Sequence, residues 1–289
     1  MLLLLALFIL GLNQAALAEY KLVHGPDPRD PMQVHIYELD NGLTVYLTQN
    51  HEEPRFYAEI AVRAGSKHDP QDATGIAHYL EHMLFKGSRQ LGTIDFEKEK
   101  KHLDRIENLY EQHFAETDPD KRAAIYAEIN TENQLASQYA IPNELDRIYT
   151  AMGKRGLNAH TWVEETVYKV DLPANCLEQW AKIEADRFHQ PVFRLFQTEL
   201  ETVYEEKNRT LDNKGRVIRY AVQEQLYKKH PYRIQTIGTV EHLKNPSLER
   251  MYAFYNTYYV PNNMAILISG DIDIKSTIQL IDREFSHWQ

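Results

Sequence analysis

The sequence predicts an α+β fold, a layered domain in which helices cover a largely antiparallel sheet and a helical hairpin is inserted. Three observations predict it. Two short alternating segments flank a hairpin turn, several long segments have helical spacing, and strands and helices alternate along the chain. This mixture of hairpins and crossovers is typical of α+β layers. With 289 residues the chain can bury a sizeable core.

Alternating polarity in the N-terminal part of the domain predicts the first strands. Residues 34–39 and 43–48 alternate in polarity around Asp40-Asn41-Gly42. Asn-Gly between two such segments is a strong hairpin signal. A third strand is expected at residues 57–62, followed by a turn-rich stretch and a helix at residues 75–85.

The next segment predicts a helical hairpin. Residues 95–140 are rich in charge, lack glycine and carry apolar residues at helical spacing. Asp118-Pro119-Asp120 interrupts the pattern and predicts two helices, within an insertion of about 95–150. The remaining expected elements are strands at 166–172 and 264–269, and helices at 177–188, 194–211 and from after Gly270-Asp271 to Phe285. We expect residues 19–289 to form a single domain.

Composition restricts the possible partners and metal ligands. The formal net charge is -10, which argues against nucleic acid and anionic lipid surfaces as main partners. Cys176 is the single cysteine, so an internal disulfide and a cysteine-rich zinc site are both excluded. Any metal must therefore be held by His, Asp and Glu, and the chain has 13 histidines.

The first 18 residues have the pattern of a signal peptide. Met1 to Leu12 is an almost unbroken apolar run, too short to span a bilayer, and Ala16-Leu17-Ala18 is a small-x-small cleavage site. No Lys or Arg precedes the run, and an uncleaved membrane anchor is the alternative. Either interpretation predicts export to the periplasm or the outside of the cell, with no further membrane span in the mature protein.

A metal-binding pattern lies in the helix expected at residues 75–85. At about 100° per residue, His78, Glu81 and His82 fall in one sector and the apolar residues in another. Histidines at i and i+4 suit two ligands of a tetrahedral zinc, and Glu81 is placed to take a proton from a water. The order His-x-x-Glu-His inverts the familiar H-E-x-x-H pattern. A solvated helix face with two surface histidines is the alternative.

A third ligand is expected on the helix at residues 194–211. Its apolar face comprises Phe196, Leu200, Val203 and Leu211. Glu199 and Glu206 lie seven residues apart at the edge of that face, where a carboxylate is unfavourable unless a cation pairs with it. We therefore expect Glu206 as the ligand and Glu199 as a supporting carboxylate. Glu205 becomes the ligand if the helix is shifted in phase, and solvated border glutamates are the remaining alternative.

With these segments the sequence resembles the pitrilysin and insulinase family of zinc peptidases, the inverzincins, which includes mitochondrial processing peptidase. The matching stretches follow the family order from about residue 33 to the end: Arg63-Ala-Gly65, Gly75 to Gly87, Leu157 to Thr161, Thr166-Val-Tyr168, Glu199 to Glu206, His230-Pro231-Tyr232, Ile237-Gly238-Thr239, Tyr259 to Asn263 and Gly270-Asp271.

The resemblance implies a zinc endopeptidase. It implies one Zn2+ bound by His78, His82 and Glu206, with Glu81 as the base and Glu199 in support. It also implies that the peptide substrate adds as an extended strand to a sheet edge beside Asn158 and Ala159. From the residues alone, that pair could equally be a loop leading into a strand.

Two departures from the family pattern affect the expected function. His82 and Glu206 are further apart than is usual, because of residues 95–150, which could cover or narrow the cleft. The family also pairs two related domains around a closed chamber, so a second homologous domain or chain is expected as a partner. Two alternatives stay open: a peptide-binding or partner subunit without catalysis, and a metal hydrolase acting on substrates other than peptides.

Overall fold

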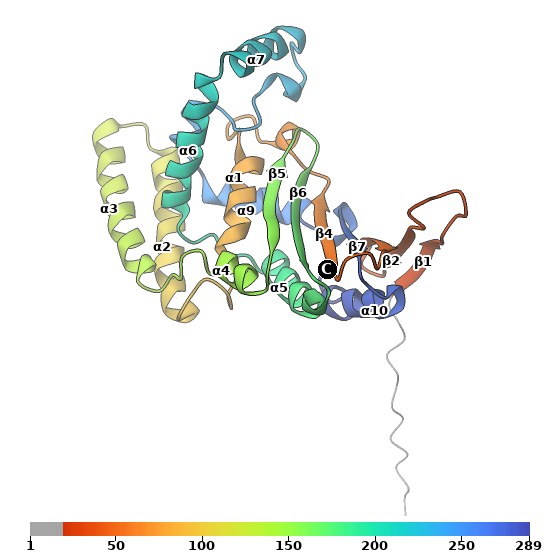
Figure 1. Cartoon of the computed structure of the whole chain (residues 1–289). Coiled ribbons are helices and arrows are strands. Elements are labelled where there is room, and N and C mark those ends of the chain that lie inside the picture. Colours follow the sequence, from red (N-terminus) through yellow and green to blue (C-terminus); the bar gives the residue numbers. More distant parts are fainter. Residues whose placement is uncertain (1–19) are drawn as a thin grey trace, which may run out of the picture.

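The computed structural model of the protein describes residues 20–289, and the expected signal peptide at residues 1–18 lies outside this part. One sheet of seven strands forms the centre, in the order β1-β2-β3-β7-β4-β6-β5 (Figure 1). The strands are β1 (Tyr20–His24), β2 (His35–Leu39), β3 (Thr44–Gln49), β4 (Arg55–Val62), β5 (Arg155–Thr161), β6 (Thr166–Pro173) and β7 (Met264–Gly270).

The helices account for most of the remaining chain. They are α1 (Ile76–Met83), α2 (Phe96–Ala115), α3 (Pro119–Ser137), α4 (Glu144–Ala151), α5 (Leu177–His189), α6 (Phe196–Asp212), α7 (Lys214–Leu226), α8 (Val240–Leu243), α9 (Leu248–Tyr258) and α10 (Ile274–Phe285). Short 3-10 helices are η1 (Ser66–His68), η2 (Leu84–Lys86), η3 (Ala174–Cys176), η4 (Pro231–Arg233) and η5 (Pro261–Asn263). None of the helices within residues 20–289 is both long and apolar enough to cross a membrane.

The α+β prediction with a largely antiparallel sheet is confirmed. Adjacent strands pair antiparallel except β3 and β7, which run parallel. β7 comes last in the chain but lies between β3 and β4, so it joins the N-terminal hairpin to the rest of the sheet. β5 forms one edge of the described sheet, next to β6.

One face of the sheet is buried under helices. Phe56 on β4 is 1% exposed and packs edge-on against Trp180 of α5, with ring centroids 5.9 Å apart. Tyr168 on β6 contacts Phe188 of α5 in the same manner. On the opposite face, Tyr57 is 41% exposed, as the two-residue period of a strand requires when one face is open.

The predicted helical hairpin is confirmed, and it packs against α6. α2 and α3 lie side by side, and α6 lies between this pair and α1 (Figure 1). Asp118 caps α3 by accepting hydrogen bonds from the backbone of Asp120 and Lys121, and Pro119 occupies the first turn, where proline is favoured. The turn residues that split the sequence pattern therefore also begin the second helix.

Arg194 connects the hairpin to the start of α6. Its Nε donates to Glu99 Oε1 at 2.9 Å, and both side chains are almost fully buried, 1% and 0% exposed. The remaining guanidinium hydrogens are donated to the carbonyl oxygens of Lys86, Ser88 and Leu91 in the segment after α1. One buried cation thus fixes α2, α6 and the end of the α1 region relative to one another.

We expect Arg194→Ala to lower the free energy of unfolding by about 3–5 kcal/mol, because it leaves the Glu99 carboxylate buried without its cation. Chemical denaturation measures this change. Arg105→Ala is the matched control, since the ion pair of Arg105 with Glu128 is exposed and removing it should change stability by about 1 kcal/mol or less. Equal losses in the two variants would contradict the assignment.

Candidate metal centre

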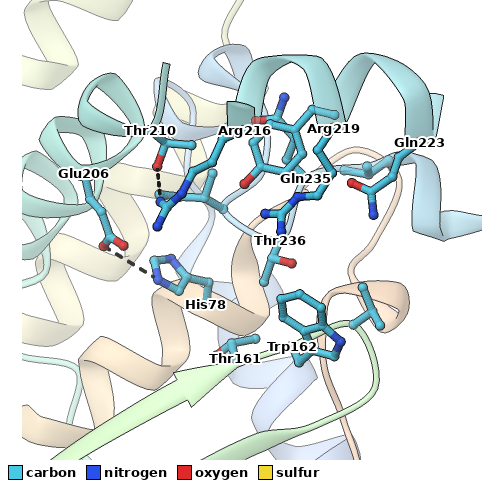
Figure 2. Close-up of a pocket in the computed structure, with 14 residues that line it drawn as sticks. His78, Thr161, Trp162, Glu206, Thr210, Arg216, Arg219, Gln223, Gln235 and Thr236 are labelled. Atoms are coloured by element: carbon cyan, nitrogen blue, oxygen red, sulfur yellow. Dashed lines mark hydrogen bonds and ion pairs between the residues drawn. The ribbon is translucent and has the colours of Figure 1, made fainter. Parts of the chain in front are cut away.

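The expected metal ligands come together on facing sides of α1 and α6. His78 Nε2 lies 3.7 Å from Glu206 Oε2, and His82 Nε2 lies 3.6 Å from the same oxygen. One ligand atom from each of the three residues lies within 4.8 Å of the others. Figure 2 shows the Glu206 carboxylate directed from α6 toward the His78 ring on α1. His78 and His82, which lie one helical turn apart, and the carboxylate of Glu206, which is distant in the sequence, therefore lie close together, as expected from the sequence.

The local backbone of α1 explains how the helix reaches this position. Gly75, its N-cap, has φ of 93°, a left-handed conformation that glycine adopts without penalty. A Cβ atom at Gly75 would lie 2.7 Å from the carbonyl oxygen of Ile237. Only glycine allows the segment around Ile237 and Gly238 to approach the start of α1 so closely, and this segment forms a wall beside the metal ligands.

The residues fit a divalent ion. Tetrahedral zinc with bonds of about 2.0–2.1 Å places its ligand atoms about 3.4 Å apart, close to the 3.6 and 3.7 Å observed. Those distances are too long for hydrogen bonds. His78 makes no hydrogen bond with the described residues although its side chain is only 12% exposed: its Nδ1 is buried without a partner, and its Nε2 lies 3.7 Å from Glu206 Oε2. A cation shared with Glu206 would give its Nε2 a partner.

The charge state of His78 suits ligation, whereas the acidic neighbours of His82 favour its protonated form when no metal is bound. Burial, followed by the charge of neighbouring His82, lowers the pKa of His78 to about 3. The ring is therefore neutral at pH 7, as a metal ligand must be. Burial alone would lower the pKa of His82, but its hydrogen bond to Glu199 and the charges of Glu199, Glu81 and Glu206 outweigh this and raise it.

Glu199 lies behind His82, on the side away from Glu206. Its Oε1 and His82 Nδ1 are 2.7 Å apart, and its second oxygen pairs with the Lys86 ammonium. Burial raises the pKa of Glu199, but the hydrogen bonds from His82 and Lys86 outweigh it, so the pKa is lowered. An ionised carboxylate bound to Nδ1 leaves Nε2 as the nitrogen that faces Glu206.

Glu81 is directed into the same cavity without joining the three ligands. It is 7% exposed, and its Oε2 accepts a hydrogen bond of 2.6 Å from the Thr161 hydroxyl on β5. Burial raises the pKa of Glu81, although the hydrogen bond from Thr161 opposes the shift. A carboxylate of raised pKa, held in one orientation, suits proton transfer close to neutral pH.

Asn158 and Ala159 lie on β5, not in a loop, so the sheet edge reaches the site. Both line the cavity of about 510 Å³ that also contains the three ligands, Glu81 and Glu199. Asn158 is exposed and Ala159 is 9% exposed. β5 and the candidate metal ligands therefore line one cavity.

The structure differs from the expectations at two points, the buried face of α6 and the lining of the cavity. Leu211 is 45% exposed, so it is not part of the buried face of α6; Lys207 and Thr210 take this place because the loop around Gly238 covers that side. The α2–α3 hairpin does not narrow this cavity, because none of the residues lining it lies in 95–150. Glu205, the fallback ligand, lines a different cavity together with Glu201 on the hairpin side of α6.

Comparison with known proteins agrees with this geometry. A family model described as "Insulinase (Peptidase family M16)" matches residues 44–104, the segment that contains His78, Glu81 and His82. A second, described as "Peptidase M16 inactive domain", matches residues 246–289. A probable zinc protease PqqL of Haemophilus influenzae is 27% identical over 97% of this chain and 26% of its own length.

The predicted resemblance to the insulinase and pitrilysin family, M16, is confirmed.

Solved structures of M16 peptidases have the same fold. The first half of the periplasmic protease PqqL of Escherichia coli superimposes with a TM-score of 0.67 and 22% identity, covering 91% of this chain and 48% of the other. Pitrilysin superimposes with a TM-score of 0.65 and 20% identity, covering 92% of this chain and 24% of the other. The chain spans about a quarter of the length of the Haemophilus relative.

The sequence does not predict several residues that the structure places at the site. Lys86 follows His82 by one helical turn, so its contact with Glu199 could have been expected from spacing. Thr161 lies in a matched stretch, but no pattern in the sequence pairs it with Glu81. Arg216 and Arg219 lie in a segment for which no structure was expected.

Proposed function

We propose that this chain is the metal-binding half of a zinc endopeptidase that hydrolyses peptides or unfolded segments bound as an extended strand. The observation that carries the proposal is the convergence of His78, His82 and Glu206, with Glu81 in the same cavity and an edge strand beside it. These are the components of metal-assisted hydrolysis, and the family match to the segment bearing three of the four residues supports them.

His78, His82 and Glu206 would hold the zinc ion. When bound there, zinc supplies Lewis-acid chemistry, lowering the pKa of a water and polarising the substrate carbonyl. Glu81 accepts the proton of the attacking water and then delivers it to the leaving amine. Thr161 keeps the Glu81 carboxylate oriented through its hydrogen bond. Burial raises the pKa of Glu81 above its usual value, which makes the carboxylate a stronger base toward the attacking water.

The substrate would lie along β5. An extended peptide can pair with the free edge of this strand, so that main-chain hydrogen bonds supply affinity independent of sequence. Asn158 and Ala159 would make these contacts, since both lie on β5 and line the cavity of the metal ligands. This position brings a peptide carbonyl toward Glu81 and the three ligands.

We expect Glu199→Ala to weaken zinc binding by about 10- to 100-fold without removing a ligand, because His82 loses the partner that orients its ring. Isothermal titration with zinc measures the change. Glu201→Ala is the matched control on the same helix, since Glu201 lines a different cavity. Unchanged affinity in Glu199→Ala would show that the carboxylate is only a structural partner of Lys86.

The organisation of the whole protein is part of the proposal. Residues 19–289 would form a single metallopeptidase domain with a helical insertion at about 95–150, exported by a signal peptide at residues 1–18. A second homologous domain or chain would close the substrate chamber, which the partial coverage of the relatives supports. PqqL of Escherichia coli is a periplasmic protease, and this location supports export of the present chain as well.

A partner subunit that binds peptides without cleaving them is the second candidate. The match of residues 246–289 to a model described as an inactive domain favours it. That segment contributes α9, β7 and α10, however, and contains none of the proposed ligands. Because ligands and base are intact elsewhere in the chain, we favour the peptidase.

A fluorogenic peptide assay separates the two functions. We expect hydrolysis by the chain, alone or with its second half, to stop when a chelator removes the metal and to return when zinc is added. Hydrolysis that continues after the chelator has removed the metal would contradict the proposed mechanism. Peptide binding without hydrolysis in every combination would favour the partner subunit.

A further inference from the structure

A second cavity adjoins the metal ligands on the side of α7. It has a volume of about 270 Å³, and His78, Glu206 and Thr161 line both this cavity and the one that contains Glu81. Its other walls are α7, the turn after β5 and the segment 234–237 (Figure 2). A substrate group bound here would therefore lie next to the reacting bond.

Contacts between distant segments build these walls. The turn after β5 is connected to η4 through Glu164, whose carboxylate contacts both Lys67 and the Tyr232 hydroxyl. Lys207 of α6, only 4% exposed, donates to the Gly238 carbonyl oxygen at 2.7 Å. This contact holds the end of the segment 234–238 against α6. The cavity is thus a formed part of the fold rather than a gap at the surface.

Two exposed guanidinium groups, those of Arg216 and Arg219, face this cavity, and neither forms an ion pair with a carboxylate of the described residues. Figure 2 shows Arg216 and Arg219 extending from α7 into the space above His78 and Thr236. The groups that they contact are neutral: Arg216 Nη1 lies 3.4 Å from Thr210 Oγ1, and Arg219 Cζ lies 5.4 Å from the ring centroid of Tyr220. Within residues 20–289, neither arginine has a carboxylate at ion-pair distance.

The remaining lining suits the stem of an acidic residue. Among the described residues that line the cavity, Glu206 alone carries a carboxylate, and it faces the histidines. Trp162, which is 54% exposed, and Ile234 offer apolar surface beside the arginines. Guanidinium forks bind carboxylates through paired hydrogen bonds, and this pair lies on a chain whose net charge is -10.

We propose that Arg216 and Arg219 bind a carboxylate of the peptide substrate, so that the enzyme selects peptides with an acidic group next to the cleaved bond. This inference rests on the proposed peptidase function. The carboxylate belongs either to an Asp or Glu side chain or to the C-terminus of the peptide. In the first case the enzyme prefers an internal acidic residue, and in the second it cleaves near the end of a chain.

Binding of labelled peptides to the zinc-supplemented Glu81→Gln variant tests the proposal without turnover. All peptides of the main set share one sequence and an amidated C-terminus, and Glu, Gln or Lys replaces one residue at a time along that sequence. A further peptide carries no charged side chain but has a free C-terminal carboxylate. At one position we expect Glu to bind about tenfold more tightly than Gln, and Lys more weakly than Gln. Trp162 emission should change on binding, since Trp180 and Trp288 are buried.

Substitution of the arginines separates the cavity from the zinc ion as the source of this preference. Arg216→Gln combined with Arg219→Gln should remove the preference for Glu in the peptide. Arg216→Glu combined with Arg219→Glu should make the peptide with Lys at that position bind most tightly. Arg209→Gln, an exposed position on α6 outside the cavity, should retain it. Circular dichroism confirms that each variant is folded.

The outcomes are distinguishable. A preference for the free C-terminus, lost with the arginines, assigns the pair to the peptide end instead of a side chain. Equal binding of all peptides, or a preference that survives both arginine substitutions, would overturn this inference alone. If no peptide binds, with or without the second half of the enzyme, the proposed function fails together with it.

Discussion

Glu81→Gln is expected to lower kcat/KM for peptide hydrolysis by about 10²- to 10⁴-fold while zinc stays bound. Glutamine has nearly the same shape as glutamate and can still accept a hydrogen bond from Thr161. It cannot take a proton from the attacking water. Because Glu81 does not belong to the three proposed ligands, the metal content should remain that of the unchanged chain.

The measurement is steady-state hydrolysis of a fluorogenic peptide, with metal analysis of the same samples. Glu205→Gln is the matched control, because it removes one carboxylate from α6 on the side of the other cavity and should leave both activity and zinc unchanged. Full activity in Glu81→Gln would contradict its role as the base. Loss of zinc in that variant would assign it to the ligands instead.

His78→Ala, His82→Ala and Glu206→Ala are each expected to lose the metal. Each removes one of the three protein ligands, so zinc affinity should fall by more than the about 10- to 100-fold expected when a supporting residue is removed. Activity should disappear with the metal. The folded state should persist, since the three side chains are at the surface of a cavity and not in the packed core.

Metal content after dialysis and titration with zinc give the two readouts. His51→Ala is the control for loss of an imidazole, because His51 is exposed and pairs with Asp271 far from the cavity. If His78→Ala or His82→Ala bound zinc as tightly as the unchanged chain, the proposed site would be wrong.

The strongest local signals in the sequence predicted most of the fold. The Asn-Gly turn, the interrupted helical pattern at Pro119 and the period of α1 each correspond to an element in the structure. The sequence of β5, with Gly156 and Asn158, has low strand propensity and does not by itself predict a strand. Pairing with β6 makes it one. The place of β7 depends on pairing with residues more than two hundred positions away, which no local pattern encodes.

The segment after α6 shows a different reason for failure. α7 contains no buried residue, and its apolar side chains Ile218, Val222 and Leu226 are exposed. An exposed apolar stripe does not indicate which neighbour a helix packs against. The position of Arg216 and Arg219 therefore follows only from the tertiary structure.

The convergence of the candidate metal ligands could be predicted because their spacing obeys simple geometry. One helical turn places His78 beside His82, and a carboxylate at the border of an apolar face, such as that of Glu206, needs a cation. The contacts that orient these residues are different in kind. The hydrogen bond from Thr161 to Glu81 joins a strand to a helix 80 positions apart, and a single sequence contains no information on such a pairing.

A crystal structure of the zinc-loaded chain, with anomalous data collected at the zinc edge, tests the central claim most directly. We expect one anomalous peak per chain, bonded to His78 Nε2, His82 Nε2 and the Glu206 carboxylate at about 2.0–2.2 Å. A peak at any other group of residues, or the absence of a peak between α1 and α6 in zinc-saturated crystals, would contradict the account.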